Sequence, residues 1–136
     1  MSASVQNGKA GLSDSGQRAK FPRSRRLLRR SDFERVYKQG RRHFAAHMTV
    51  FFLPRAQGEG VRVGFTVGRM LGGAVERNRM KRRLREAVRL HCPAESAAVD
   101  VVINPKKSLL TADFAQLENE IRRAFEVIQK SLKSAK

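Results

Sequence analysis

The side chains with the clearest chemical potential in this sequence are the arginines between residues 77 and 89. A guanidinium group can donate two parallel hydrogen bonds to one phosphate, and arginine outnumbers lysine here, which favours recognition of phosphate geometry over attraction to a point charge. We expect a polyphosphate backbone to be contacted by Arg77, Asn78, Arg79, Lys81, Arg82, Arg85 and Arg89.

A helix over residues 74–91 positions these side chains. It follows a pair of glycines, and its apolar residues recur at helical spacing until Pro93 ends the run. At about 100° per residue, Met80, Leu84 and Ala87 share one side and the charges lie opposite. Like charges three or four residues apart repel by a few tenths of a kcal/mol per pair, and an external polyanion would offset that repulsion.

Two other interpretations of this helix are open at this point. It could be a solvated surface helix whose charges face water only. It could also lie on anionic lipid, but such helices present large apolar residues free to insert, whereas this apolar side is needed by the core of the domain. Binding to a soluble polyanion is therefore the favoured interpretation.

Catalytic groups are hard to find in the sequence. His43 and His47 are four residues apart, but their surroundings indicate strand or turn and no third ligand is near. No nucleophile is paired with a base, and the twelve carboxylates form no cluster suited to two-metal cleavage of a phosphodiester. We expect no catalytic residue and no metal site in the protein itself.

Composition narrows the class further. The chain has 136 residues, a formal net charge of +17 and 40% hydrophobic residues, which predicts one small basic domain above the disordered class. The single Cys92 excludes a disulfide scaffold and a zinc cage and favours a reducing, cytoplasmic compartment. No apolar run is long enough to span a bilayer, so we expect no membrane partner.

The chain divides into three parts. Residues 1–20 lack periodicity and are predicted to be a disordered tail. Residues 21–131 are predicted to form an α/β domain that binds the polyanion, expected to be an RNA, and residues 132–136 a basic C-terminal tail. The arginine-rich start of the domain, up to residue 30, is expected to be an extended arm laid against it, with a solvated linker as the alternative.

The remaining elements complete an α/β sandwich. The pattern S-D-F-E at Ser31 predicts a capped helix over residues 32–39 with a left-handed stop at Gly40. Residues 48–53 and 61–67 are predicted to form a hairpin. The apolar run 99–103 predicts a strand, and Thr111 and Asp113 open a last amphipathic helix. The sequence itself does not set the hand of the crossover through the second helix, and base rates favour a right-handed one.

Unpaired RNA is usually held by aromatic rings that stack on bases and by nearby cations. The stripe Phe33, Val36 and Tyr37 on the first helix faces the sheet, where small and polar residues on one side of strand 61–67 should leave room. An aromatic from residues 48–53 should lie over the same side. The predicted groove is lined by Phe33, Tyr37, Phe52, Arg62 and Thr66, unless the stripe simply packs as core.

Two blocks of this sequence resemble a known family. The stretch VGRMLGGAVERNRMKRRLRE (67–86) is similar to the RNR signature of the bacterial ribonuclease P protein subunit, and SDFERVYKQG (31–40) is similar to the first helix of that family. The resemblance covers roughly residues 21–129. It implies an αβββαβα sandwich, with a mixed sheet and a left-handed crossover in place of the base-rate right-handed one. The family often has two lysines where this chain has Arg69 and Met70, so a phosphate contact is carried over to Arg69 only.

The resemblance also implies a function. The protein would assist a catalytic RNA in the endonucleolytic removal of the 5′ leader from precursor tRNA, with the groove holding the leader and the basic helix docking on the catalytic RNA. Mg²⁺ held mainly by the RNA would serve the hydrolysis, and no obligatory protein partner is implied. The rival hypothesis is a non-enzymatic ribosomal or chaperone-like RNA-binding protein with the same basic helix.

Overall fold

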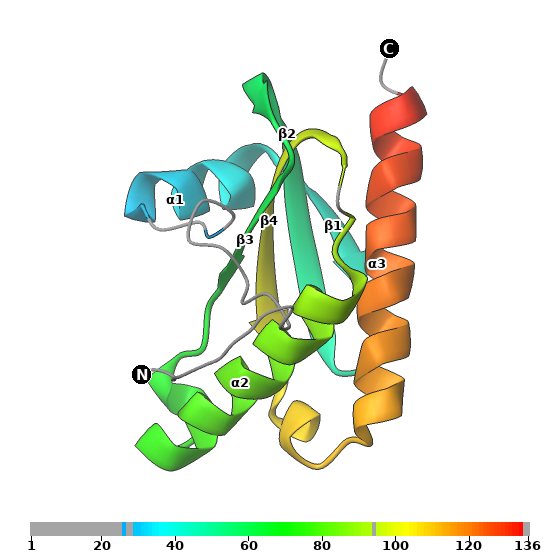
Figure 1. The fold of residues 1–136 in the computed structure, drawn as a ribbon. Coiled ribbons are helices and arrows are strands. Elements are labelled where there is room, and N and C mark those ends of the chain that lie inside the picture. The colour runs from blue at the N-terminus through cyan, green and yellow to red at the C-terminus, as the bar shows by residue number, and fades with distance from the viewer. Residues whose placement is uncertain (1–25, 27–28, 94, 135–136) are drawn as a thin grey trace, which may run out of the picture.

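The computed structural model describes residues 26, 29–93 and 95–134 (Figure 1). Along the chain the elements are α1 (Arg30–Gln39), β1 (Arg41–Phe44), β2 (Met48–Glu59), β3 (Val61–Phe65), the 3-10 turn η2 (Arg69–Leu71), α2 (Ala74–His91), β4 (Ala97–Pro105), the 3-10 turn η3 (Lys107–Leu110) and α3 (Phe114–Ser134). The order of helices and strands is the predicted αβββαβα, and the predicted range of the second helix is confirmed.

The four strands form one mixed sheet in the order β1-β2-β4-β3. The β1/β2 and β2/β4 pairs are antiparallel, and β3/β4 is parallel. The predicted hairpin between β2 and β3 is therefore wrong, because β4 lies between them. Residues 98–103 of β4 are buried on both faces, and a strand of that kind takes a central position. The turn at Gly58 and Gly60, both with positive φ, instead leads β2 past β4 to β3.

The crossover connection from β3 through α2 to β4 has the less common handedness for two parallel strands. In the view of Figure 1, β3 and β4 both run downward, α2 crosses in front of the sheet and β4 lies to the right of β3. This is a left-handed crossover, as the family resemblance implied and contrary to the base rate.

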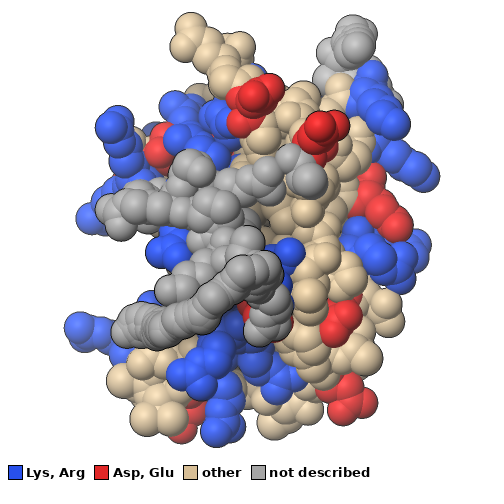
Figure 2. Space-filling view, viewed as in Figure 1, with Lys and Arg blue, Asp and Glu red and all other residues tan. Residues whose placement is uncertain are grey.

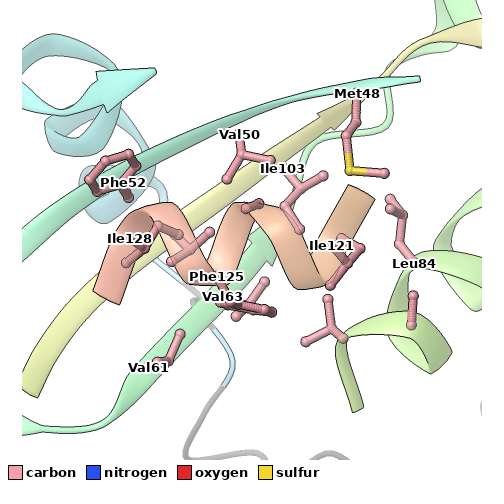
Figure 3. Packing of buried hydrophobic residues seen from close by; sticks show 14 of the residues in the cluster. Met48, Val50, Phe52, Val61, Val63, Leu84, Ile103, Ile121, Phe125 and Ile128 are labelled. Atoms are coloured by element: carbon pink, nitrogen blue, oxygen red, sulfur yellow. The ribbon is translucent and has the colours of Figure 1, made fainter. Parts of the chain in front are cut away.

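The main core lies between the sheet and the two helices α2 and α3 (Figures 1 and 3). The apolar sides of α2 and α3 are buried there, as their helical spacing predicted. The largest buried side chains of this core include Met48, Met80, Leu84, Ile103, Leu109, Leu117, Ile121 and Ile128. Burial of this cluster is the dominant favourable contribution to folding.

Helix α1 covers the opposite side of the sheet. Val36 of α1 and Val102 of β4 are fully buried between the two layers. We call this side of the sheet, with the residues of α1 that pack on it, the α1 face. Successive strand residues point to opposite faces, so residue parity decides which strand side chains belong to the α1 face.

The predicted cap of α1 is wrong. The helix begins at Arg30, and the carbonyl of Arg29 accepts from the backbone N–H groups of Asp32 and Phe33. Ser31 therefore lies inside the first turn. Glu34 pairs with Arg30, at 3.6 Å, instead of reaching back to Ser31.

Gly40 ends α1 for a different reason from the one predicted. Its backbone is extended, with φ of −80°, so no left-handed conformation is required. A Cβ at this position would instead lie 2.5 Å from the carbonyl oxygen of Val36 and 2.7 Å from that of Phe52. The glycine lets the end of α1 approach β2 more closely than any side chain would permit.

The two ends of the domain also bear on the sequence predictions. The backbone of Arg26 forms a parallel bridge to Val63 at the outer edge of β3, whereas residues 21–25 and 27–28 of the predicted arm lie outside the described residues. Helix α3 continues to Ser134, past the predicted boundary at residue 131, because Leu132 still packs against the core. The predicted tail over residues 1–20 lies outside the described residues. Within the described part, no helix has the length and apolarity to cross a membrane.

Candidate nucleic-acid interface

Helix α2 separates its apolar and charged side chains as its periodicity predicts. Met80, Leu84, Ala87 and Val88 are completely buried against the core. The exposed opposite side carries Asn78, Arg79, Arg82 and Arg85, and Arg69 is exposed just before the helix. Figure 2 shows Lys and Arg gathered over the region of α2, whereas both signs of charge occur along α3. We call the exposed residues Arg69, Asn78, Arg79, Arg82 and Arg85 the basic face.

Some cations of α2 serve the fold as well. Arg83 is half-buried and donates to the carbonyl oxygens of Leu110 and Ala112, which ties α2 to the turn before α3. Arg89, predicted to contact RNA, pairs with Glu86 one turn earlier and is half-buried. Arg77 and Lys81 are also half-buried. Among the predicted contact residues of α2, the half-buried ones are therefore less accessible to a partner than the exposed residues of the basic face.

Arg26 adds a positive charge beside Arg82 and Arg85 of α2. Partial burial, and then the charges of Arg26 and Arg82, lower the pKa of Arg85 below its usual value. Arg26 reaches this position because its backbone pairs with the edge of β3. Sequence spacing along α2 could not reveal a contribution from residue 26. A phosphate group bound among these three guanidinium groups would relieve their mutual repulsion.

The α1 face brings together four of the five residues predicted for the groove. Phe33 and Tyr37 are half-buried around Val36, and the Tyr37 hydroxyl lies 2.7 Å from the Thr66 hydroxyl. Arg62 lies four residues before Thr66, which directly follows β3, and the alternation of strand residues puts both on this side of the sheet. Tyr37 also donates to Oδ1 of Asn104, at 2.8 Å, a partner that the sequence did not suggest.

Phe52, the fifth predicted residue, lies on the wrong side of the sheet. Its side chain is only 3% exposed and belongs to the main core, near Ile128 of α3 (Figure 3). Phe51 takes the expected place on the α1 face. Its ring meets that of Tyr37 edge to face, with 4.9 Å between centroids, and the Arg42 guanidinium lies 5.4 Å from its centroid.

Arg62 belongs to a buried charge cluster that the sequence patterns did not predict. Both oxygens of Asp100 accept from Arg62, at 2.9 and 3.0 Å, and Arg55 donates to the same carboxylate at 2.7 Å. Asp32 of α1 lies 3.9 Å from Arg62 and accepts from Arg35 at 2.7 Å. The cluster thereby links β2, β3, β4 and α1. The main role of the Arg62 guanidinium is therefore to hold the strands and α1 together.

Burial of Asp100 pushes its pKa up, but the hydrogen bonds and charges of Arg62 and Arg55 outweigh burial and hold the pKa below its usual value. The carboxylate is fully buried and ionised, and a buried charge of this kind is stable only with such partners.

Of the two histidines considered as metal ligands, His47 is held by partners within the fold. His47 Nδ1 lies 2.7 Å from the Ser108 hydroxyl, and its backbone N–H donates to Glu120. His43 faces α3, where burial and then the charge of Arg123 lower its pKa. Among the described residues, no group of three or more His, Cys, Asp or Glu side chains is placed to hold a metal ion.

Comparison with known proteins gives consistent matches along the domain. The ribonuclease P family model matches residues 21–129. The ribonuclease P protein component of Desulfovibrio desulfuricans is 42% identical over 104 residues, which are 74% of this chain and 80% of that protein. The corresponding protein of Symbiobacterium thermophilum is 42% identical over 101 residues, 74% of this chain and 88% of its own.

Solved structures agree with the sequence relatives. The RNase P protein of Staphylococcus aureus matches with a TM-score of 0.68 and 25% identity, over 77% of this chain and 95% of that one. The RNase P protein of Thermotoga maritima matches with a TM-score of 0.60 and 30% identity, over 72% and 96% of the two chains.

The fold and the charge distribution define a small, basic α/β protein of the RNA-binding class. The matched residues include both blocks on which the resemblance rested, the basic helix and α1. The chain belongs to the ribonuclease P protein family.

Proposed function

We propose that this chain is the protein subunit of a ribonuclease P holoenzyme and assists a catalytic RNA in removing the 5′ leader from precursor tRNA. The observation that carries the proposal is the placement of two different surfaces on one sheet. Helix α2, which carries the basic face, lies on one side of the sheet, and α1 lies on the other (Figure 1). The aromatic residues of the α1 face pack around Val36 and Val102 on that second side. One small domain can then contact two RNA segments at once.

The basic face docks on the catalytic RNA. Charge-assisted hydrogen bonds to phosphate are stronger than neutral ones, and each contact releases condensed counterions from the RNA. Arg82 and Arg85 are the principal contacts, because Arg26 adds a third positive charge there. Arg69, Arg77, Asn78, Arg79, Lys81 and Arg89 complete the docking surface.

The α1 face holds the unpaired leader. Phe33, Tyr37 and Phe51 offer half-buried rings for stacking on bases, and Arg42 lies beside the ring of Phe51 to meet a phosphate. The hydroxyl groups of Tyr37 and Thr66 add polar contacts. Arg62 contributes positive charge to this face from its position in the Asp100 cluster.

The protein contributes binding and charge neutralisation to the reaction, and the RNA carries the catalysis. Mg²⁺ would be held mainly by RNA phosphates and would supply the chemistry of metal-assisted hydrolysis. The side chains of this chain orient the leader and lower the repulsion between two polyanions, so that substrate and catalytic RNA associate with fewer cations.

Reconstitution tests the proposal. Adding this protein to a bacterial ribonuclease P RNA at low Mg²⁺ concentration should restore cleavage at the correct 5′ end of mature tRNA. The Arg82→Glu, Arg85→Glu double variant should fail to do so, whereas the matched Arg122→Glu, Arg123→Glu variant on α3 should succeed. Charge neutralisation without cleavage at the correct position would identify the chain as a general RNA binder and refute the proposal.

A further inference from the structure

Phe44 is an exposed aromatic residue that the fold does not use. Its side chain is 68% exposed at the end of the edge strand β1. Along this strand, Arg41 reaches Ser131 of α3 on one side, whereas Arg42 lies over Phe51 on the other. Because strand residues alternate, Phe44 shares the α1 face with Arg42 and Phe51.

The neighbours of Phe44 are polar and cationic. The sheet register places Phe44 opposite Thr49, which is opposite Asn104, so these three residues form a row across the α1 face. Oδ1 of Asn104 accepts from the Tyr37 hydroxyl, which leaves the Asn104 amide group with its N–H donors. The Lys106 ammonium donates to the carbonyl oxygen of Ala45, at 3.4 Å, and Ala45 is the residue that follows Phe44 in the chain.

The charge around this row indicates the kind of partner. Residues 40–58 and 101–112, which contribute β1, most of β2, the second half of β4 and the turn after it, contain no Asp or Glu. A base stacked on Phe44 would have its phosphate within reach of Lys106 or Arg42. An aromatic ring with cations beside it is the usual combination for unpaired nucleic acid.

We propose that Phe44 and Lys106 form an additional subsite for one unpaired nucleotide of the RNA leader, beyond those held at Tyr37 and Phe51. This inference rests on the proposed function and extends it toward the edge of the sheet. Phe44 is diagonal to Phe51 across the β1/β2 pair, and diagonal residues have Cα atoms about 7 to 8 Å apart. The two rings therefore follow one another along the same face. Asn104 lies on this face to donate a hydrogen bond to an acceptor on the base.

Leader-length titration of the holoenzyme tests the subsite. Wild-type protein and Phe44→Ser are each assembled with a bacterial ribonuclease P RNA, and the affinity for precursor tRNA is measured as the leader is lengthened one nucleotide at a time. Wild type should gain affinity once more when the leader becomes long enough to reach Phe44, and Phe44→Ser should lack this gain. The affinity of Phe44→Ser for precursor tRNA with a long leader should therefore be about five- to tenfold lower than that of wild type. Affinity for mature tRNA and for the shortest leaders should be unchanged, and Phe44→Tyr should retain the gain.

Lysine variants provide the matched control. Lys106→Gln should reduce the same gain, whereas Lys107→Gln, which removes the same charge from the next residue, should not. If Phe44→Ser keeps the full profile, or weakens all substrates equally, the subsite is wrong and the proposed function stands. If wild type shows no preference for leaders at all, both the subsite and leader binding by the α1 face are wrong.

Discussion

Replacing Asp100 with Asn removes the negative charge at the centre of the buried cluster while keeping the size of the side chain. Asp100 is fully buried, and Arg55 and Arg62 both donate to its carboxylate. The substitution leaves these guanidinium groups facing a neutral amide across three strands. We expect the variant to be strongly destabilised.

The magnitude follows from the exposure of the partners. Removing one member of a buried ion pair costs about 3 to 5 kcal/mol. The side chains of Arg55 and Arg62 are 16% and 32% exposed, so water reaches both guanidinium groups and the lower end applies, about 3 kcal/mol. For a domain of this size, that loss lowers Tm by on the order of 15 °C.

The pH dependence gives a second readout. The pKa of Asp100 is lowered in the folded protein from its usual value of 3.8, so the unfolded chain takes up this proton first as pH falls. The stabilisation by the charged carboxylate is therefore complete above about pH 5 and is lost as pH falls through the folded pKa. The difference in free energy of unfolding between wild type and Asp100→Asn should therefore become smaller as pH falls below about 5.

Urea unfolding at pH 7 and at several pH values below 5 measures both effects. The control is Asp113→Asn, an exposed aspartate before α3, which should change stability by less than about 0.5 kcal/mol. A stability for Asp100→Asn within about 1 kcal/mol of wild type, or a difference that does not depend on pH, would refute the stabilising role of the cluster.

Three further predictions concern the fold and the basic face. The Arg82→Glu, Arg85→Glu variant should weaken binding to the catalytic RNA by several kcal/mol, since each charge-assisted contact contributes roughly 1.5 to 3 kcal/mol; filter binding that shows equal affinity would remove the docking role. Leu84→Ala should instead lower the free energy of unfolding by about 2 to 5 kcal/mol, measured by thermal melts, and leave RNA affinity of the folded protein unchanged. Gly40→Ala should destabilise by about 1 to 3 kcal/mol, because its Cβ would overlap two backbone carbonyl oxygens, and a melt equal to wild type would contradict that geometry.

Hydrophobic periodicity was enough to predict those elements whose apolar residues fit only one orientation. The apolar stripe of α2 must face the core, so its charges must face outward, and Met80 and Leu84 lie where the helical period puts them. In β2 the residues of both parities are apolar, so alternation could not choose between Phe51 and Phe52. The register with β1 and β4 decides, and a shift by one residue exchanges the two faces.

The Asp100 cluster depends on strand order, which local patterns do not contain. Asp100 interrupts an apolar run, and its partners Arg55 and Arg62 come from the two strands on either side of β4. The predicted β2/β3 hairpin leaves no place for β4 between them, so the contact was not predictable from that arrangement. The left-handed crossover was also not predictable from local patterns, because strand twist alone favours a right-handed one.

A cleavage reagent attached to the α1 face tests the central claim most directly. In a Cys92→Ser background, an iron chelate on Thr66→Cys is assembled with the catalytic RNA and precursor tRNA, and a second protein carries the chelate on Arg79→Cys of α2. Strand scission from position 66 should be confined to the 5′ leader, and scission from position 79 should fall on the catalytic RNA. Scission from position 66 in the catalytic RNA or in the mature part of the tRNA would contradict the assignment of the two surfaces.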